Sequence, residues 1–211
     1  MTQVPPDYYF SRKNLSLDRF ISYYYQLNAV QESYPKNILF IGVGDSIVSD
    51  FLKRNKKYKI TTFDFDAELN PDVVGDIRLL PFPDKLFDLV CVFEVLEHLP
   101  YEDVSAALKE ISRVVKKDVV ISVPHRRTGF EIIIKFPFIR SLFKKDFLRF
   151  ALRFPLHFPG FAVSGQHYWE IDGNTTHLNN FRLALRKNFN INKEVTPALD
   201  FYKRFFYLTV V

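Results

Sequence analysis

Residues 37–46 constrain the fold more than any other part of the sequence, because a run of apolar residues leads there directly into Gly42-Val43-Gly44. Such a run predicts a buried strand, and the glycines predict a turn at which the backbone bends sharply and leaves room for a ligand. Apolar residues then return at helical spacing, which predicts a short helix after the turn. The unpaired N–H groups at the start of that helix favour a polar or anionic ligand.

An aspartate follows this turn at a spacing typical of nucleoside-binding sites. The next apolar run, residues 59–63, ends at Asp64. An acid about 20 residues after a glycine turn binds ribose hydroxyls in many α/β folds. The alternative is an ordinary tight turn and a capping aspartate, but the presence of both features favours the ligand site.

Strands and helices alternate along the rest of the chain. Apolar runs at residues 73–74, 87–93 and 119–123 predict strands, and a stripe from Val104 to Val115 predicts a helix before the last of them. A helix that starts near Thr175 or Thr176 precedes two final strands, at residues 190–195 and 205–211. This alternation predicts an α/β fold with a parallel sheet.

Ligands of such sheets bind beyond the carboxyl ends of the strands. Five segments fall at those ends, namely residues 42–46, Asp64, Asp76, residues 93–98 and His125. We therefore expect these segments to surround one site.

Composition favours a single domain. The 211 residues, 47% of them hydrophobic, suffice for a substantial core. The only cysteine, Cys91, excludes an internal disulfide and favours a reducing, cytoplasmic location. No apolar run reaches about 18 residues and no leader pattern opens the chain, so we expect neither a membrane span nor a signal peptide. We expect no bound metal ion.

The segments Ile41-Gly42-Val43-Gly44, Gly75-Asp76-Ile77 and Glu94-Val95-Leu96-Glu97-His98-Leu99 occur in an order that resembles the class I S-adenosylmethionine-dependent methyltransferases. The resemblance covers residues 36–123 and, by position, the last helix and two strands. It implies a Rossmann-like, doubly wound sheet of seven mostly parallel strands with an antiparallel last strand. It also implies methyl transfer from S-adenosylmethionine. The implied cofactor-binding residues, with Asp64 on the ribose and Asp76 on the adenine, are Gly42, Val43, Gly44, Asp64, Phe65, Asp76, Ile77, Phe93 and Glu94.

Two positions depart from the family pattern. Phe40 stands where an acid is usual, and Ser46 stands where a glycine is frequent. Loss of the acid leaves open a second interpretation, a catalytically inactive relative that binds only a nucleoside or a partner. A third interpretation, a dinucleotide-binding oxidoreductase, requires a glycine where Ile47 stands, because a branched side chain there blocks close helix–strand packing.

Three histidines are candidate general bases, because each lies at the expected rim of the site or near it: His98, His125 and His167. Tyr168 and Trp169 are candidate acceptor-binding residues, since polar-tipped aromatic rings can shape a pocket. The alternative is that these two rings anchor their segment to the core.

Residues 126–170 are predicted to form a largely helical cap, inserted in a single methyltransferase-like domain that spans residues 1–211. Residues 126–158 hold eight Lys/Arg and two Asp/Glu, a net charge of 8 − 2 = +6, against +5 for the whole chain. Interleaved with phenylalanines, this charge favours a small-molecule acceptor that is anionic or lipid-linked, or a peripheral membrane contact. The alternative is a packed cap with solvated basic residues. We do not expect nucleic acid as a partner, because no recognised nucleic-acid module is present.

Overall fold

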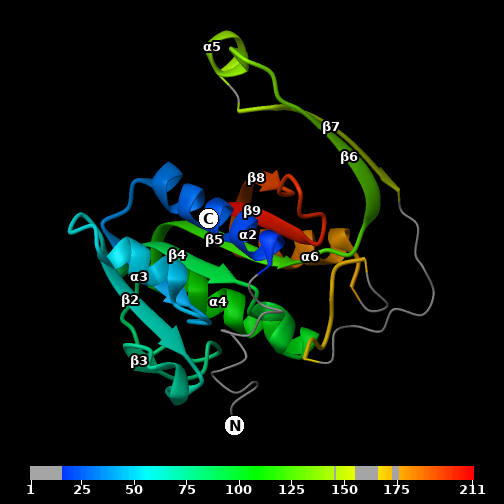
Figure 1. Cartoon of the computed structure of the whole chain (residues 1–211). Helices are drawn as coiled ribbons and strands as arrows, with labels where there is room; N and C mark the ends of the chain where they lie inside the picture. The colour runs from blue at the N-terminus through cyan, green and yellow to red at the C-terminus, as the bar shows by residue number, and fades with distance from the viewer. Residues whose placement is uncertain (1–15, 145, 155–165, 173–175) are drawn as a thin grey trace.

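The computed structural model describes residues 16–144, 146–154, 166–172 and 176–211, and Figure 1 shows their arrangement. The helices and strands follow one another as α2 (Leu17–Ser33), β1 (Asn37–Ile41), α3 (Ile47–Lys53), β2 (Lys59–Asp64), η1 (Ala67–Leu69), β3 (Val73–Val74), β4 (Phe87–Phe93), η2 (Leu96–His98), η3 (Tyr101–Asp103), α4 (Val104–Val114), β5 (Val115–Pro124), β6 (Thr128–Ile134), α5 (Ile139–Phe143), β7 (Leu148–Phe154), α6 (Leu178–Arg186), β8 (Phe189–Val195) and β9 (Lys203–Val210). No helix of these described residues is long and apolar enough to cross a membrane.

Seven strands form the main sheet in the order β3-β2-β1-β4-β5-β9-β8. The first five are parallel, and β9 runs antiparallel to both β5 and β8. The predicted seven-stranded α/β sheet with an antiparallel last strand is therefore confirmed. The usual dinucleotide-binding sheet has the order 3-2-1-4-5-6. An antiparallel strand between β5 and β8 does not fit that order.

The central strands are almost continuously apolar because both of their faces are covered. In β1, Ile38 and Phe40 point into the core beneath α2 and α3. Their neighbours Leu39 and Ile41 point into the core beneath α4 and α6. Each helix places an apolar stripe on its side of the sheet, as the predicted spacing requires.

The insertion after β5 differs from the predicted helical cap. Its described residues form a two-stranded antiparallel hairpin, β6 and β7, which projects away from the main sheet with the short helix α5 at its far end (Figure 1). The prediction was wrong because the apolar residues also recur at every second position: Phe130, Ile132 and Ile134 on one strand pair with Leu152, Phe150 and Leu148 on the other. This period of two, with β-branched residues, favours strands over helix.

Polar contacts from the middle and the α5 end of the hairpin hold it to the β8–β9 connection. Arg149 of β7 forms an ion pair with Glu131 of β6 at 2.8 Å. The same guanidinium donates hydrogen bonds to the carbonyl oxygens of Thr196 and Pro197, in the β8–β9 connection. The Leu199 N–H donates to the Glu131 carboxylate at 2.6 Å. One face of the hairpin is thus held, while the face that carries Ile132 and the residues paired with it stays exposed.

The segment after the hairpin returns to the main sheet through Trp169. The indole N–H donates to the carbonyl oxygen of Leu99 at 3.1 Å, and the ring packs between Tyr101 and Phe181. Ile171 extends this attachment, since its N–H donates to the carbonyl oxygen of Pro124. Trp169 is buried and belongs to the core on the α4 side.

We predict that Trp169→Ala lowers the free energy of unfolding by about 3–5 kcal/mol, because it leaves a large cavity in the core. Trp169→Phe should cost about 1–2 kcal/mol, since it keeps ring contacts but loses the hydrogen bond. Urea unfolding followed by circular dichroism measures both, with Tyr168→Ala as an exposed neighbouring control within about 0.5 kcal/mol of the parent. Equal stability of Trp169→Ala and the parent would contradict this role.

Candidate active site

A cavity opens at the carboxyl ends of β1, β2 and β4. Its volume is about 620 Å³, within the range of cofactor sites. All of the implied cofactor-binding residues line it: Gly42, Val43, Gly44, Asp64, Phe65, Asp76, Ile77, Phe93 and Glu94. The fold thus brings together residues that are up to 52 positions apart in the sequence, while their contact with a cofactor stays a prediction.

The turn after β1 has left-handed backbone at three positions, Gly42 (φ 86°), Gly44 (φ 55°) and Ser46 (φ 61°). At Gly42 a side chain is excluded by space as well, because a Cβ there would lie 2.3 Å from Cγ2 of Val95. Ser46 adopts the glycine-like conformation in spite of its Cβ, at a cost of about 1–2 kcal/mol. The departure from the family pattern at this position therefore leaves the shape of the turn unchanged.

Asp64 ties the end of β2 to this turn. The Val43 N–H donates to Asp64 Oδ2 at 2.7 Å, and the Asp66 N–H donates to Oδ1 at 3.0 Å. Burial raises the pKa of Asp64, and these backbone N–H groups counteract part of the rise. Each carboxylate oxygen has a second lone pair with which to accept a ribose hydroxyl. Asp66 is not among the described residues that line the cavity, and its carboxylate instead accepts the Glu68 N–H.

Asp76 lines the cavity together with Arg78, a residue that no sequence motif marks. The two side chains form an ion pair at 2.6 Å, and Arg78 also reaches Asp103 at 2.6 Å. The hydrogen bonds from Arg78 lower the pKa of Asp76, so its carboxylate is ionised near neutral pH. The Arg78 guanidinium therefore fixes the Asp76 carboxylate. An adenine amino group could donate only to the lone pairs of that carboxylate that Arg78 does not use.

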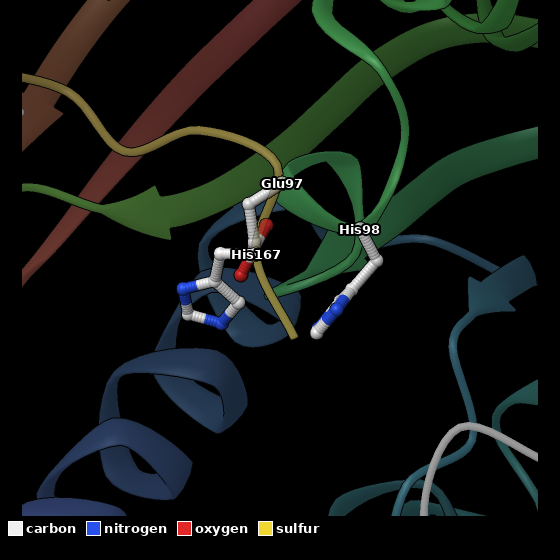
Figure 2. Close-up of side chains that lie close together, drawn as sticks. All are labelled: Glu97, His98 and His167. Carbon is white, nitrogen blue, oxygen red and sulfur yellow. The ribbon is translucent and has the colours of Figure 1, made fainter. Parts of the chain in front are cut away.

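His98 and His167 face each other at the other end of the cavity, with ring centroids 5.0 Å apart (Figure 2). His98 Nδ1 lies 3.0 Å from the carbonyl oxygen of Gln166, and His167 Nδ1 lies 2.9 Å from the carboxylate of Glu170. Because both partners are acceptors, each Nδ1 carries the proton of its hydrogen bond, and Nε2 is the acceptor nitrogen of the neutral ring. Burial lowers the pKa of His98 and favours this neutral form. Both histidines are placed as expected for a proton acceptor.

The prediction that His125 is a general base is wrong. Its side chain is fully buried, and it is not one of the described residues on the cavity wall. Its Nε2 lies 2.5 Å from Asp172, and its Nδ1 accepts a hydrogen bond from Arg204 at 2.8 Å. Burial, together with the charge of Arg204, lowers its pKa to about 4. His125 therefore joins the end of β5 to β9 and to the residues before α6.

Tyr168 and Trp169 are also displaced from their predicted role. In the described part of the chain the cavity wall includes neither of them. Trp169 is in the core, and the Tyr168 side chain is 61% exposed. Their alternative role, to anchor the segment, holds for Trp169, and what this anchoring positions is the adjacent His167.

Sequence reasoning missed the side chains that α2 and the start of β9 bring to the cavity. They include Tyr23 and Gln26 of α2, Lys203 of β9 and Tyr202 just before β9. The Tyr23 hydroxyl donates to the carboxylate of Asp45 in the glycine turn. Burial and this acceptor raise the pKa of Tyr23, so the hydroxyl stays protonated. No motif marks these residues, because their position depends on how the first helix and the last strand pack on the sheet.

A sequence profile described as a methyltransferase domain matches residues 39–123, which hold the glycine turn, Asp64, Asp76 and the segment up to His98. Residues 39–123 are therefore similar to the methyltransferase domains that this profile describes. The residues present fit the cofactor, since the turn excludes side chains at Gly42 and Asp64 offers buried acceptor oxygens beside it. No curated protein sequence matches the chain.

Solved structures of methyltransferases share the fold of this chain over nearly its whole length. An S-adenosylmethionine-dependent methyltransferase from Aquifex aeolicus has a TM-score of 0.62 and 14% identity, covering 99% of this chain and 100% of that one. One from Clostridium acetobutylicum has a TM-score of 0.62 and 11% identity, covering 96% of each chain. The N-methyltransferase NodS from Bradyrhizobium japonicum, solved with S-adenosyl-L-homocysteine, has a TM-score of 0.55 and 13% identity, covering 94% of this chain and 90% of that one.

We predict that Asp64→Ala weakens binding of S-adenosyl-L-homocysteine roughly tenfold to a hundredfold, because charge-assisted hydrogen bonds contribute about 1.5–3 kcal/mol. Asp66→Ala is the matched control, since this carboxylate is two residues away but is turned to η1. Isothermal titration calorimetry measures both affinities. The reverse order of effects would mean that Asp66 holds the ribose.

Proposed function

We propose that the methyltransferase domain of this protein transfers a methyl group to a small-molecule acceptor, anionic or lipid-linked, that enters beside His98 and His167. The observation that carries the proposal is that one cavity is lined both by the implied cofactor residues and by His98 and His167, whose rings lie 5.0 Å apart. An acceptor at the histidine end would meet the cofactor within one enclosed space.

The chain's own residues position the reactants and exclude water. S-adenosylmethionine, when bound, supplies an electrophilic methyl group on a sulfonium. The glycine turn, Asp64 and Asp76 would hold its nucleoside part, and correct placement of two reactants lowers a barrier by about 7–11 kcal/mol. For an acceptor that must lose a proton, His98 or His167 would take it at Nε2. Phe40 and Phe93, with ring centroids 6.1 Å apart, make part of the cavity wall apolar.

We expect the protein to bind one S-adenosylmethionine per chain in calorimetry and to show no comparable affinity for NAD. Release of S-adenosyl-L-homocysteine on incubation with lipid and metabolite extracts then distinguishes an enzyme from an inactive relative. A preference for NAD, or binding of neither compound, would contradict the proposal. Binding without turnover in any extract would favour the inactive relative, whose main support is Phe40.

The hairpin gives a reason to propose a peripheral membrane contact as well. Its exposed face carries large apolar side chains, among them Ile132 (51% exposed) and Phe150 (61%), and α5 adds Leu142 (70%). Leu17 and Phe20 of α2 share an open hollow with Phe150 and continue this surface. Such an exposed apolar surface marks a binding site.

The charge around this surface favours an anionic membrane as the partner. Residues 126–158 have a net charge of +6, and Arg140 in α5 is largely exposed. Exposed apolar side chains beside cations bind anionic lipid surfaces, and each cation near the surface contributes about 1 kcal/mol. The cytoplasmic leaflet has such a surface. The buried, unpaired Cys91 agrees with the cytoplasm as the proposed compartment.

The protein should sediment with vesicles that contain phosphatidylserine more than with neutral vesicles, and added salt should reduce this binding because it screens the basic residues. Ile132→Asp and Phe150→Asp should each release the protein. Leu183→Asp is the matched control, because Leu183 is equally exposed but lies on α6. Equal loss in the control, or no sedimentation of the parent, would refute the membrane contact.

A further inference from the structure

Glu97 is a buried carboxylate that the proposed reaction does not use. Its side chain is fully buried, and neither of its carboxylate oxygens has a hydrogen-bond partner among the described residues. Buried polar groups are almost always satisfied, and an unpaired buried carboxylate is costly. An arrangement that lacks a donor for two buried oxygens therefore points to a ligand that supplies positive charge.

The oxygens of Glu97 lie beside the two histidines of the cavity. One ligand atom from each of Glu97, His98 and His167 falls within 4.8 Å of the other two. Figure 2 shows the carboxylate of Glu97 between the two imidazole rings. Ligand atoms of a tetrahedral cation are about 3.4 Å apart at bond lengths of about 2.1 Å, so the three side chains would have to close by up to about 1.4 Å to share one ion.

The hydrogen bonds of both rings occupy one nitrogen and leave the other for a metal ion. His98 Nδ1 is engaged by the carbonyl oxygen of Gln166, and His167 Nδ1 by the carboxylate of Glu170. Neither Nε2 has a hydrogen-bond partner among the described residues, so a metal ion could bind there. A histidine that binds a metal typically donates its other N–H to a carbonyl or a carboxylate, as both do here.

The carboxylate that orients His167 is itself fixed. Arg126 forms an ion pair with Glu170 at 2.8 Å, and the Tyr202 hydroxyl donates to the same carboxylate at 2.5 Å. This second layer holds the His167 ring in one orientation, which is the arrangement that tunes metal ligands. A histidine packed only for stability would not require it.

We propose that Glu97, His98 and His167 bind one divalent transition-metal ion at the histidine end of the cavity. Two imidazole nitrogens and one carboxylate oxygen suit Zn²⁺, Mn²⁺ or Fe²⁺ better than Mg²⁺ or Ca²⁺, which prefer oxygen ligands. Three protein ligands leave coordination positions open toward the cavity. There the ion would bind an oxygen atom of the acceptor, such as a hydroxyl or a carboxylate. With the ion bound, both Nε2 lone pairs are ligands, so the ion would lower the pKa of that oxygen and take the place of a histidine base. This role rests on the proposed function, while the metal site does not.

Metal binding is tested on untagged protein treated with a chelator and then dialysed against Zn²⁺, Mn²⁺ or Mg²⁺. The site should take up one Zn²⁺ per chain, more tightly than Mn²⁺, and Mg²⁺ least, because affinity at nitrogen and oxygen sites rises along the first-row metals. Co²⁺ in the same site should give a visible absorption band that Zn²⁺ abolishes.

Three substitutions should each remove this binding by about a hundredfold or more: Glu97→Gln, His98→Ala and His167→Ala. Glu170→Gln should weaken it by about 10–100-fold, as loss of a second-layer partner does. His177→Ala is the matched control, since His177 is exposed and lies outside the cavity. Circular dichroism checks that each variant is folded. If a variant does not fold, the Co²⁺ spectrum of the parent, recorded with and without competing Zn²⁺, tests the site instead.

Two results would overturn the metal site: no uptake of any of these ions by the parent, or unchanged uptake in Glu97→Gln and His167→Ala. Calorimetry with S-adenosyl-L-homocysteine, with the chelator and without it, separates the two proposals. Cofactor binding without metal uptake leaves the methyltransferase in place and removes the metal site. Metal uptake without cofactor binding does the reverse.

Discussion

The hydrogen bond from the Val43 N–H to the Asp64 carboxylate holds the cavity together. β1 and β2 are paired in parallel up to Ile41 and Phe63, and the Gly42 N–H extends the pairing to the Phe63 carbonyl oxygen at 2.9 Å. Beyond that point, in the described part of the chain, the Asp64 carboxylate is the hydrogen-bond link from the turn to β2. The Asp64 carboxylate accepts this hydrogen bond and holds the left-handed turn in position. The turn therefore has its shape before a ligand binds.

Sequence patterns sufficed for the parts of the fold whose residues are buried on a regular period. β1 and β4 were predictable because strands covered on both faces need unbroken apolar runs. In α6, Leu178, Phe181 and Leu185 are the buried residues, as their spacing indicated. The cofactor end of the cavity was predictable for a related reason, since the carboxyl ends of parallel strands must share one edge of the sheet.

The other end of the cavity was not predictable, because it depends on contacts between distant segments. The apolar residues between positions 139 and 150 fit both a helical and an alternating spacing. The strand at Phe150 is fixed by its pairing with Ile132 on the other strand of the hairpin, which local spacing does not reveal. His125 and His167 both follow β5 in the sequence, yet one is sealed in a polar network and the other lines the cavity. The contact of Glu97 with His167 joins positions 70 residues apart, and no local spacing reveals it.

The packing of Trp169 makes its fluorescence an intrinsic probe of the segment around it. The chain has a single tryptophan, so emission excited at the long-wavelength edge of indole absorption, where tyrosine does not absorb, arises from one known place. That place is buried between Tyr101 and Phe181, two positions along the chain from His167. A shift of this segment would change the polarity and rigidity around the indole. The emission wavelength and lifetime of Trp169 would therefore report changes near His167 in solution. No added label is needed, and the signal is separate from the glycine turn.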